Sequence, residues 1–281
     1  SIEKVQEVMG VVKRVWIDTY SDIAGAGFIK EYCPKQFVLV GSGNYNFDGS
    51  TTLGTAEGGR KVLLYVINHF DADNQEGVKE LIHTVEHEFG HILHQNISYP
   101  AEFKQITGGS YTANWSSIQM AEARARGFIT PYAMASPDED FVEMISVMLI
   151  EGKEGYERII ACETNGTSRQ LLRAKEQTVV EYFRKSYDID FSELQTKVQE
   201  AIQEIAPGEP VPERPPVFDL WGFGKEYSTV KFDLNFMNFP PGFAERFVAD
   251  YNALTKHGYA LATYFRLYFS EENYVTLQLH Y

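Results

Sequence analysis

The chain has 281 residues, of which 44% are hydrophobic and 14% aromatic, and its formal net charge is −14. This apolar content excludes a disordered protein, and the negative charge argues against nucleic acid or an anionic membrane surface as a partner. No run of 18 apolar residues occurs, so the sequence predicts no transmembrane segment. We expect the two cysteines, Cys33 and Cys162, to be free buried thiols.

The first quarter of the chain predicts a helix followed by two strands. Apolar residues recur at helical spacing over 2–20. Aliphatic and β-branched runs predict strands at 37–40 and 61–66, separated by a loop at 41–60 that is rich in Gly, Asn, Ser and Thr. We expect segment 61–68 to form the rim of a cleft, where the edge of a strand can pair with an extended substrate backbone.

The next predicted helix contains the most informative motif of the chain, His87-Glu88-Phe89-Gly90-His91. Residues i and i+4 share one face of a helix, so the imidazoles of His87 and His91 can bind one metal ion. Glu88, beside the first histidine, can then serve as general base toward a zinc-activated water. Gly90 weakens a helix interior by about 1 kcal/mol relative to Ala, which indicates close packing or a need for space near the metal.

A zinc site needs a third protein ligand, and the sequence offers two candidates. Glu139 and Glu143 lie on one side of a predicted helix at 138–151, where the first can bind the metal and the second can accept the outer N–H of a ligating histidine. Ser136 before them also fits a capping box, in which Glu139 only closes the start of the helix. His94 is the alternative ligand, but on a straight helix it would have to lean back a full turn to reach the metal.

The rest of the chain predicts a helical region, a linker and a second domain. Further helices are predicted at 119–126, 154–160, 168–186 and 191–205. Five prolines within 206–216 indicate a semi-rigid, extended linker. Beyond it, strands are predicted at 229–236, 259–269 and 273–281, and a helix at 243–257. We therefore predict a first domain over 1–205 and a small β-α-β-β accessory domain over 217–281.

The spacing of these residues resembles that of known zinc peptidases. Tyr132 stands seven residues before Glu139-x-x-x-Glu143, a pattern similar to the gluzincin metallopeptidases and, within them, to the anthrax-lethal-factor-like group. Other segments resemble the substrate-import-associated zinc metallohydrolase lipoproteins of Bacteroidetes, over roughly residues 1–205: 54–59, 87–95, 99–104, 127–129 and 132–133. The resemblance implies that His87, His91 and Glu139 bind zinc and that Tyr132 faces the substrate.

We therefore predict an α+β protein with a zincin-like, mainly helical catalytic domain, a small mixed sheet, and a small C-terminal α+β domain. Its predicted function is that of a metallopeptidase with Zn²⁺ as cofactor and a peptide or protein as substrate. Glu88 is the predicted general base, and Tyr132 is the predicted hydrogen-bond donor to the tetrahedral oxyanion. Trp115 and Tyr111 are weaker candidates for the lining of the substrate cleft.

The resemblance also implies a cellular setting, which is extracytoplasmic and lipid-anchored at the outer membrane or cell surface. The implied partner is outer-membrane nutrient-import machinery. Two other functions remain open at this point. One is a non-catalytic surface protein that keeps the zincin fold for binding, against which the complete set of His87, Glu88 and His91 argues. The other is a zinc hydrolase that acts on a non-peptide amide.

Overall fold

A computed structural model gives the fold of the chain. It describes residues 2–45, 51–52, 54–57, 61–163 and 165–208, and the backbone of strands at 229–233, 264–269 and 275–280. The chain divides into two compact units, Ser1–Gly208 and Glu209–Tyr281. Within the described residues, no helix combines the length and the apolar character that crossing a membrane requires. Most of the predicted linker at 206–216, and the whole helix predicted at 243–257, lie outside the described residues.

The first unit opens with a helical region, as predicted for 2–20. Its elements are α1 (Ile2–Val11), the π-helix η1 (Val12–Asp18), α2 (Thr19–Ala24) and α3 (Ala26–Tyr32). The region is anchored by aromatic side chains, because Trp16 and Tyr20 are fully buried and meet the ring of Phe89 edge-on, with centroids 4.9 and 5.1 Å away. These contacts tie the first helices to the helix that carries the metal motif.

A small mixed sheet follows. Its strand order is β1 (Gln36–Leu39), β5 (Lys61–Leu64) and β4 (Gly54–Glu57), with β1 parallel and β4 antiparallel to β5. The predicted loop at 41–60 therefore contains strand β4, and also the short pair β2 (Asn44–Tyr45) and β3 (Thr51–Thr52). The expectation that the strand in 61–68 offers an edge to a substrate is wrong, because that strand, β5, is central and both of its edges are paired.

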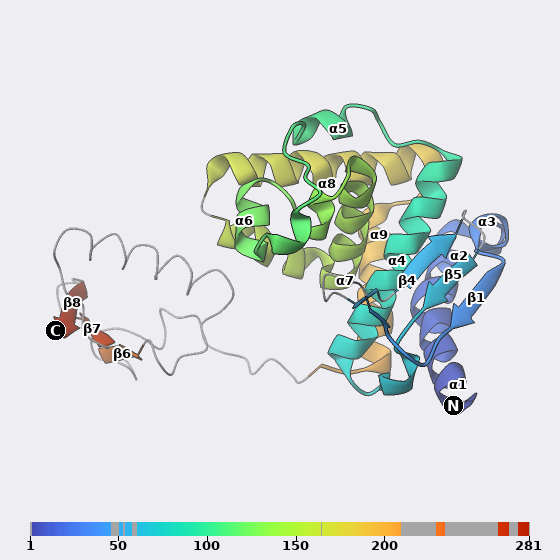
Figure 1. The fold of residues 1–281 in the computed structure, drawn as a ribbon, viewed down its shortest axis with the longest axis horizontal. Helices are drawn as coiled ribbons and strands as arrows, with labels where there is room; N and C mark the ends of the chain where they lie inside the picture. The colour runs from blue at the N-terminus through green and yellow to red at the C-terminus, as the bar shows by residue number, and fades with distance from the viewer. Residues whose placement is uncertain are drawn as a thin grey trace. The chain divides into compact units, whose positions relative to one another are not determined.

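Two long helices, α4 (Gln75–Asn96) and α7 (Pro137–Cys162), lie against each other in the centre of the unit (Figure 1). They are in close contact at Gly90, where an added Cβ would lie 2.9 Å from Val142 Cγ1. A glycine at this position lets the backbone of α4 come within van der Waals distance of α7. The glycine that weakens the helix is thus explained by helix packing.

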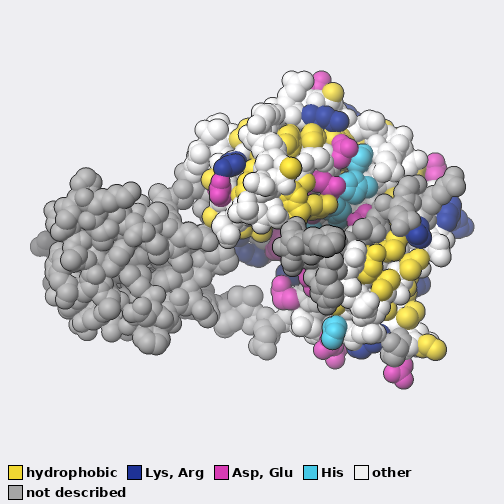
Figure 2. Space-filling view, in the orientation of Figure 1, with side chains coloured by type: hydrophobic (Ala, Val, Ile, Leu, Met, Phe, Trp, Pro, Cys, Tyr) yellow, Lys and Arg dark blue, Asp and Glu magenta, His cyan; other side chains and the backbone are white. Residues whose placement is uncertain are grey.

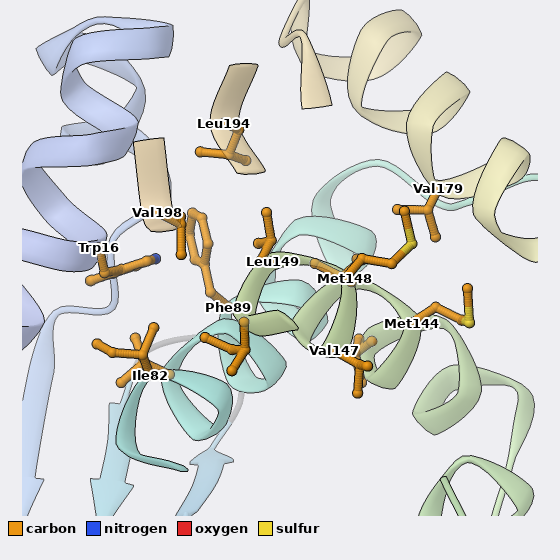
Figure 3. Packing of buried hydrophobic residues seen from close by; sticks show 14 of the residues in the cluster. Trp16, Ile82, Phe89, Met144, Val147, Met148, Leu149, Val179, Leu194 and Val198 are labelled. Carbon is orange, nitrogen blue, oxygen red and sulfur yellow. The ribbon is translucent and has the colours of Figure 1, made fainter. Parts of the chain in front are cut away.

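The remaining helices enclose this pair. After α4 in the chain these are α5 (Phe103–Ile106), η3 (Trp115–Ser117), α6 (Met120–Ala125), η4 (Tyr132–Met134), α8 (Gly166–Tyr187) and α9 (Phe191–Ile205), and the short η2 (Ile67–His69) stands between β5 and α4. Figure 3 shows Phe89 of α4 packed among Trp16, Leu149 and Val198, which brings α7, α9 and η1 onto one core. The two helices predicted at 138–151 and 154–160 are the two parts of α7, which bends at Gly152, where φ is 67°.

In the second unit, three strands form an antiparallel sheet in the order β6 (Thr229–Asp233), β7 (Tyr264–Phe269) and β8 (Val275–His280). These strands fall inside the three segments predicted to be extended. The role of this unit as an accessory domain stays a prediction.

Both cysteines are free thiols, as expected. Cys33 is partly buried just after α3, and Cys162 is exposed at the last residue of α7. The expectation of burial is therefore wrong for Cys162, because the helix ends at the surface of the unit.

Candidate metal centre

The two motif histidines of α4 face the start of α7. One carboxylate oxygen of Glu139, Oε2, lies 3.0 Å from Nε2 of His87 and 3.3 Å from Nε2 of His91. Ligands bound tetrahedrally to zinc at about 2.0–2.2 Å lie roughly 3.4 Å from one another, so the Glu139 oxygen is already close to the separation from each histidine nitrogen that zinc requires. All three donor atoms lie within 4.8 Å of one another. Two imidazole nitrogens and one carboxylate oxygen are also a donor set typical of catalytic zinc, which leaves a fourth position open.

The carboxylates around His87 favour the binding of a cation. Burial opposes a charge on His87, but hydrogen bonds to Glu139 and Glu143 outweigh it and raise the pKa of His87 to about 10. Burial alone would raise the pKa of Glu139, yet His87 and His91 lower it to about 2. In the metal-free protein a proton on His87 therefore balances the carboxylates. A divalent cation can take the place of that proton, so the residues fit zinc.

The start of α7 explains how Glu139 is placed. The hydroxyl of Ser136 accepts a hydrogen bond from the backbone N–H of Glu139 at 3.2 Å, and Pro137 occupies the first turn. The helix start predicted from Ser136 is therefore present. The side chain of Glu139, however, extends to the two histidines, so the cap does not exclude Glu139 from the metal centre.

Behind His87 lies a second carboxylate, that of Glu143, which is buried. Its Oε1 accepts from Nδ1 of His87 at 2.8 Å and lies 3.0 Å from Nε2 of His83, while its Oε2 accepts from the hydroxyl of Thr130 at 2.6 Å. Burial opposes the charge of Glu143, but the charge and hydrogen bonds of His83 and His87 hold its pKa well below the usual range. Sequence reasoning missed both His83 and Thr130.

A positional signal existed for His83, which stands four residues before His87 and so shares its helix face. Nothing in the sequence pointed to Thr130. His83, His87 and Glu143 also form a second group of donor atoms that lie within 4.8 Å of one another, as do His87, His91 and Glu139.

His94 contacts the motif from the other side. Its Nε2 lies 3.0 Å from Nδ1 of His91, the ring nitrogen that does not face Glu139. Its ring also packs edge-on against Tyr99 and Phe141. Burial, together with the charge of His91, lowers the pKa of His94. His94 is therefore placed to support His91 from behind, rather than beside Glu139.

Two candidate catalytic side chains lie next to these ligands. They are Tyr132 and Glu88. Burial raises the pKa of Tyr132, and the charges of Glu139 and Glu88 raise it further. The charge of Glu88 also raises the pKa of His87. The ring of Tyr132 stacks on His87 at a centroid distance of 5.6 Å, and its hydroxyl lies within the influence of the Glu139 charge. Trp115 meets Tyr132 edge-on at 4.8 Å, so it belongs to the same wall of the site.

Tyr111 has a different place. Its hydroxyl donates to Asp140 at 2.9 Å, and Asp140 also pairs with Lys175 at 2.7 Å, with neither charged side chain exposed to solvent. Lys175 in addition donates to the backbone carbonyl of Gly127. Asp140 directly follows Glu139 on α7, so this buried network holds the ligand-bearing turn from the inside. The expectation that Tyr111 lines the cleft has no support in this geometry.

The candidate centre is open to solvent on one side. The side chain of Glu139 is 22% exposed and that of His91 is 16% exposed, while Tyr132 is more exposed than either. Figure 2 shows histidine side chains grouped at the surface of the first unit, next to acidic and hydrophobic side chains. Solvent therefore has access to the residues that carry the donor atoms.

Comparison with known proteins agrees with this geometry. The putative zinc-binding metallo-peptidase family matches residues 1–192, about two thirds of the chain. The chain belongs to this family. A crystal structure of a putative zinc-binding metallo-peptidase from Bacteroides caccae is similar at 32% sequence identity and a TM-score of 0.62, covering 71% of this chain and 76% of that chain. No curated protein sequence matches the chain.

Membership in this metallo-peptidase family covers the sheet, the long helices α4 and α7 and all the donor residues described above. The resemblance to a family of zinc peptidases is thus confirmed at this level.

Proposed function

We propose that this protein is a zinc-dependent peptidase of the gluzincin type, in which His87, His91 and Glu139 bind the metal. The observation that carries the proposal is the meeting of two Nε2 atoms and one carboxylate oxygen at 3.0 and 3.3 Å, beside Glu88. Zinc held there would polarise the scissile carbonyl and increase the acidity of a water molecule.

Glu88 supplies the proton transfers. It follows His87 in α4 and is buried, and its charge acts on both His87 and Tyr132, so we place its carboxylate where it can accept a proton from the attacking water. The same group can pass that proton to the leaving amine after the tetrahedral intermediate forms. A protein that only bound peptides would have no use for a carboxylate between its two metal ligands, so Glu88 favours catalysis over binding.

Tyr132 supplies a hydrogen-bond donor. Its ring stacks on the ring of His87, and its hydroxyl is close enough to Glu139 to be influenced by that charge. Because the side chain is 37% exposed, it can turn this donor to the carbonyl oxygen of a bound peptide, where negative charge develops. One donor of this kind is worth roughly 2.7–4 kcal/mol in the transition state.

Strand β4 is the element best placed to hold the peptide. In the described part of the sheet it is an outer strand, and it lies against α4, where an added Cβ at Gly54 would reach Thr84. Thr84 is one turn before Glu88. An extended substrate that pairs with the outer edge that β4 has among the described strands would therefore run along the metal-bearing helix.

The test replaces Glu88 with Gln. Glu88→Gln should retain one zinc per chain, because the residue is not a ligand, and should lower kcat by about 10²–10⁴-fold, the usual contribution of a general base. Turnover is measured on cleavage sites first identified by digesting a peptide library. Glu80→Gln, an exposed position on the same helix, is the control. Loss of zinc in Glu88→Gln, or unchanged turnover, would overturn the scheme.

We also propose an extracytoplasmic, lipid-anchored setting near nutrient-import machinery, on the basis of the sequence resemblance alone. Fractionation of the native bacterium tests it, with an antibody against this protein and labelling by a radioactive fatty acid. The expected result is labelled protein in the outer-membrane fraction. Unlabelled protein in the cytosol would contradict it.

A further inference from the structure

One carboxylate connects the metal ligand His87 to the turn that carries Tyr132. Glu143 accepts three hydrogen bonds: from His87 and His83 at Oε1, and from Thr130 at Oε2. The Thr130 oxygen in turn accepts from the backbone N–H of Ala133 at 3.1 Å. Ala133 is the middle residue of η4, the short helix that begins with Tyr132.

We propose that His83 and Thr130 are positioning residues of the metal centre, which act through Glu143. His83 fixes Oε1 of the carboxylate, so that the oxygen stays in line with Nδ1 of His87. Thr130 fixes Oε2 and at the same time fixes the start of η4. The ring of His87 and the ring of Tyr132, which stack on each other, are therefore both aligned to a single carboxylate. This inference rests on the proposed function for its catalytic part only.

The burial of Glu143 makes these donors matter. The side chain is 4% exposed, so solvent has little access to an oxygen that loses its donor, above all the one that faces Thr130. A carboxylate with three donors has little freedom to rotate, whereas one with a single donor can turn away from His87. Groups that orient a metal-binding histidine typically contribute 10–100-fold in metal affinity or activity.

His83 could instead be a ligand of a second metal ion, together with His87 and Glu143, since their donor atoms are close enough. The chemistry of His87 argues against this. Its Nε2 faces Glu139 and its Nδ1 faces Glu143. A neutral imidazole that binds a metal through Nε2 keeps its proton on Nδ1, and that proton occupies the direction from which a second ion would bind. The geometry therefore favours hydrogen bonding by His83.

The experiment compares matched pairs of variants. Thr130→Val removes the hydroxyl at nearly constant volume, and Thr130→Ser retains it. His83→Leu removes the donor, and His83→Gln retains an N–H donor. Thr196→Val, which loses an exposed hydroxyl on α9, and His69→Leu, an exposed histidine, are the controls. Circular dichroism and thermal unfolding with saturating zinc establish that each variant is folded.

The first readout is zinc affinity, measured by competition with a chromophoric chelator. We expect Thr130→Val and His83→Leu to raise the zinc Kd by about 3–30-fold. This is smaller than the roughly 10–100-fold loss expected when a group bonded directly to the ligating histidine is removed, because both residues act through Glu143. Thr130→Ser, His83→Gln and the controls should stay within twofold of the original protein. The visible spectrum of the cobalt-substituted protein should change in the two deficient variants alone, because it reports ligand geometry.

The second readout separates Thr130 from His83. Thr130→Val should lower kcat by about tenfold with little change in KM, because it also removes the hydrogen bond that holds the turn of Tyr132. His83→Leu should act through zinc affinity alone, so most of its activity should return at saturating zinc. Wild-type zinc affinity and cobalt spectra in both deficient variants would overturn the proposal. So would two tightly bound zinc ions that become one in His83→Leu. If no variant or wild type cleaves peptides, the proposed function fails, yet the zinc measurements still decide the positioning roles.

Discussion

Glu86, next to His87 in α4, is a buried carboxyl group whose protonation should make the stability of the protein depend on pH. Its side chain is fully buried, and Oε2 accepts a hydrogen bond from the hydroxyl of Tyr20 at 2.9 Å. Oε1 has no hydrogen-bond partner within the described part of the chain. Burial raises the pKa of Glu86 from 4.5 to about 8, so the carboxyl is protonated in the folded protein at neutral pH.

The sign of the effect on stability follows from this shift. A group whose pKa is higher in the folded than in the unfolded state stabilises the protein below the unfolded pKa, here 4.5. That contribution is lost as the pH rises toward the folded pKa of about 8. The two pKa values differ by about 3.5, and each unit corresponds to roughly 1.36 kcal/mol, so Glu86 can cost the folded state up to about 5 kcal/mol at alkaline pH.

Glu86→Gln removes this titration but keeps the shape and an acceptor for Tyr20. At pH 5 the variant should be equal to or slightly less stable than wild type, because the amide brings two N–H donors into a buried site. At pH 9 it should be more stable. Between these values we expect the difference in the free energy of unfolding to change by about 2–5 kcal/mol in favour of the variant.

Urea unfolding of both proteins from pH 5 to 9, at the same saturating zinc concentration, measures this difference. The pH dependence of zinc binding is common to both proteins and cancels in the comparison. Glu80→Gln on the same helix controls for the general effect of replacing a glutamate. Parallel stability curves for wild type and Glu86→Gln would refute the reasoning, since they would mean that Glu86 does not change its protonation on unfolding over this range.

Four further predictions follow from the structure. Glu139→Ala should weaken zinc binding, measured by chelator competition, much more than His94→Ala; the reverse order would reduce Glu139 to a helix cap. Lys175→Met leaves a buried carboxylate unpaired, so urea unfolding should show a loss of about 3–5 kcal/mol, and an unchanged midpoint would contradict the buried network. Gly152→Ala should cost about 1–3 kcal/mol in the same assay, because φ is 67° and an added Cβ would lie 2.7 Å from a neighbouring side chain; unchanged stability would mean that α7 can straighten there. Residues 1–208 alone should unfold cooperatively and bind zinc as the full chain does, and loss of zinc would place the second unit in the metal-binding domain.

Much of the first unit could be predicted because the deciding signals are local. The apolar spacing of α4 and the register of His87, Glu88 and His91 depend on helix geometry alone. The start of α7 is encoded by Ser136 and Pro137, which act within one turn. Strand β4 was missed because four residues, one of them Gly54, carry no alternation signal, and their extended form depends on pairing with β5.

Sequence alone determined that two imidazoles and the carboxylate of Glu88 share one helix and that two carboxylates share another. Only the tertiary structure decided which carboxylate meets which nitrogen: Glu139 faces Nε2 of both motif histidines, and Glu143 faces Nδ1 of His87. These partners stand 48–56 residues apart in the chain, and the close contact of α4 with α7 at Gly90 sets their positions. Helical periodicity predicts the face on which a side chain lies, but the rotation of its ring depends on the packing of distant segments.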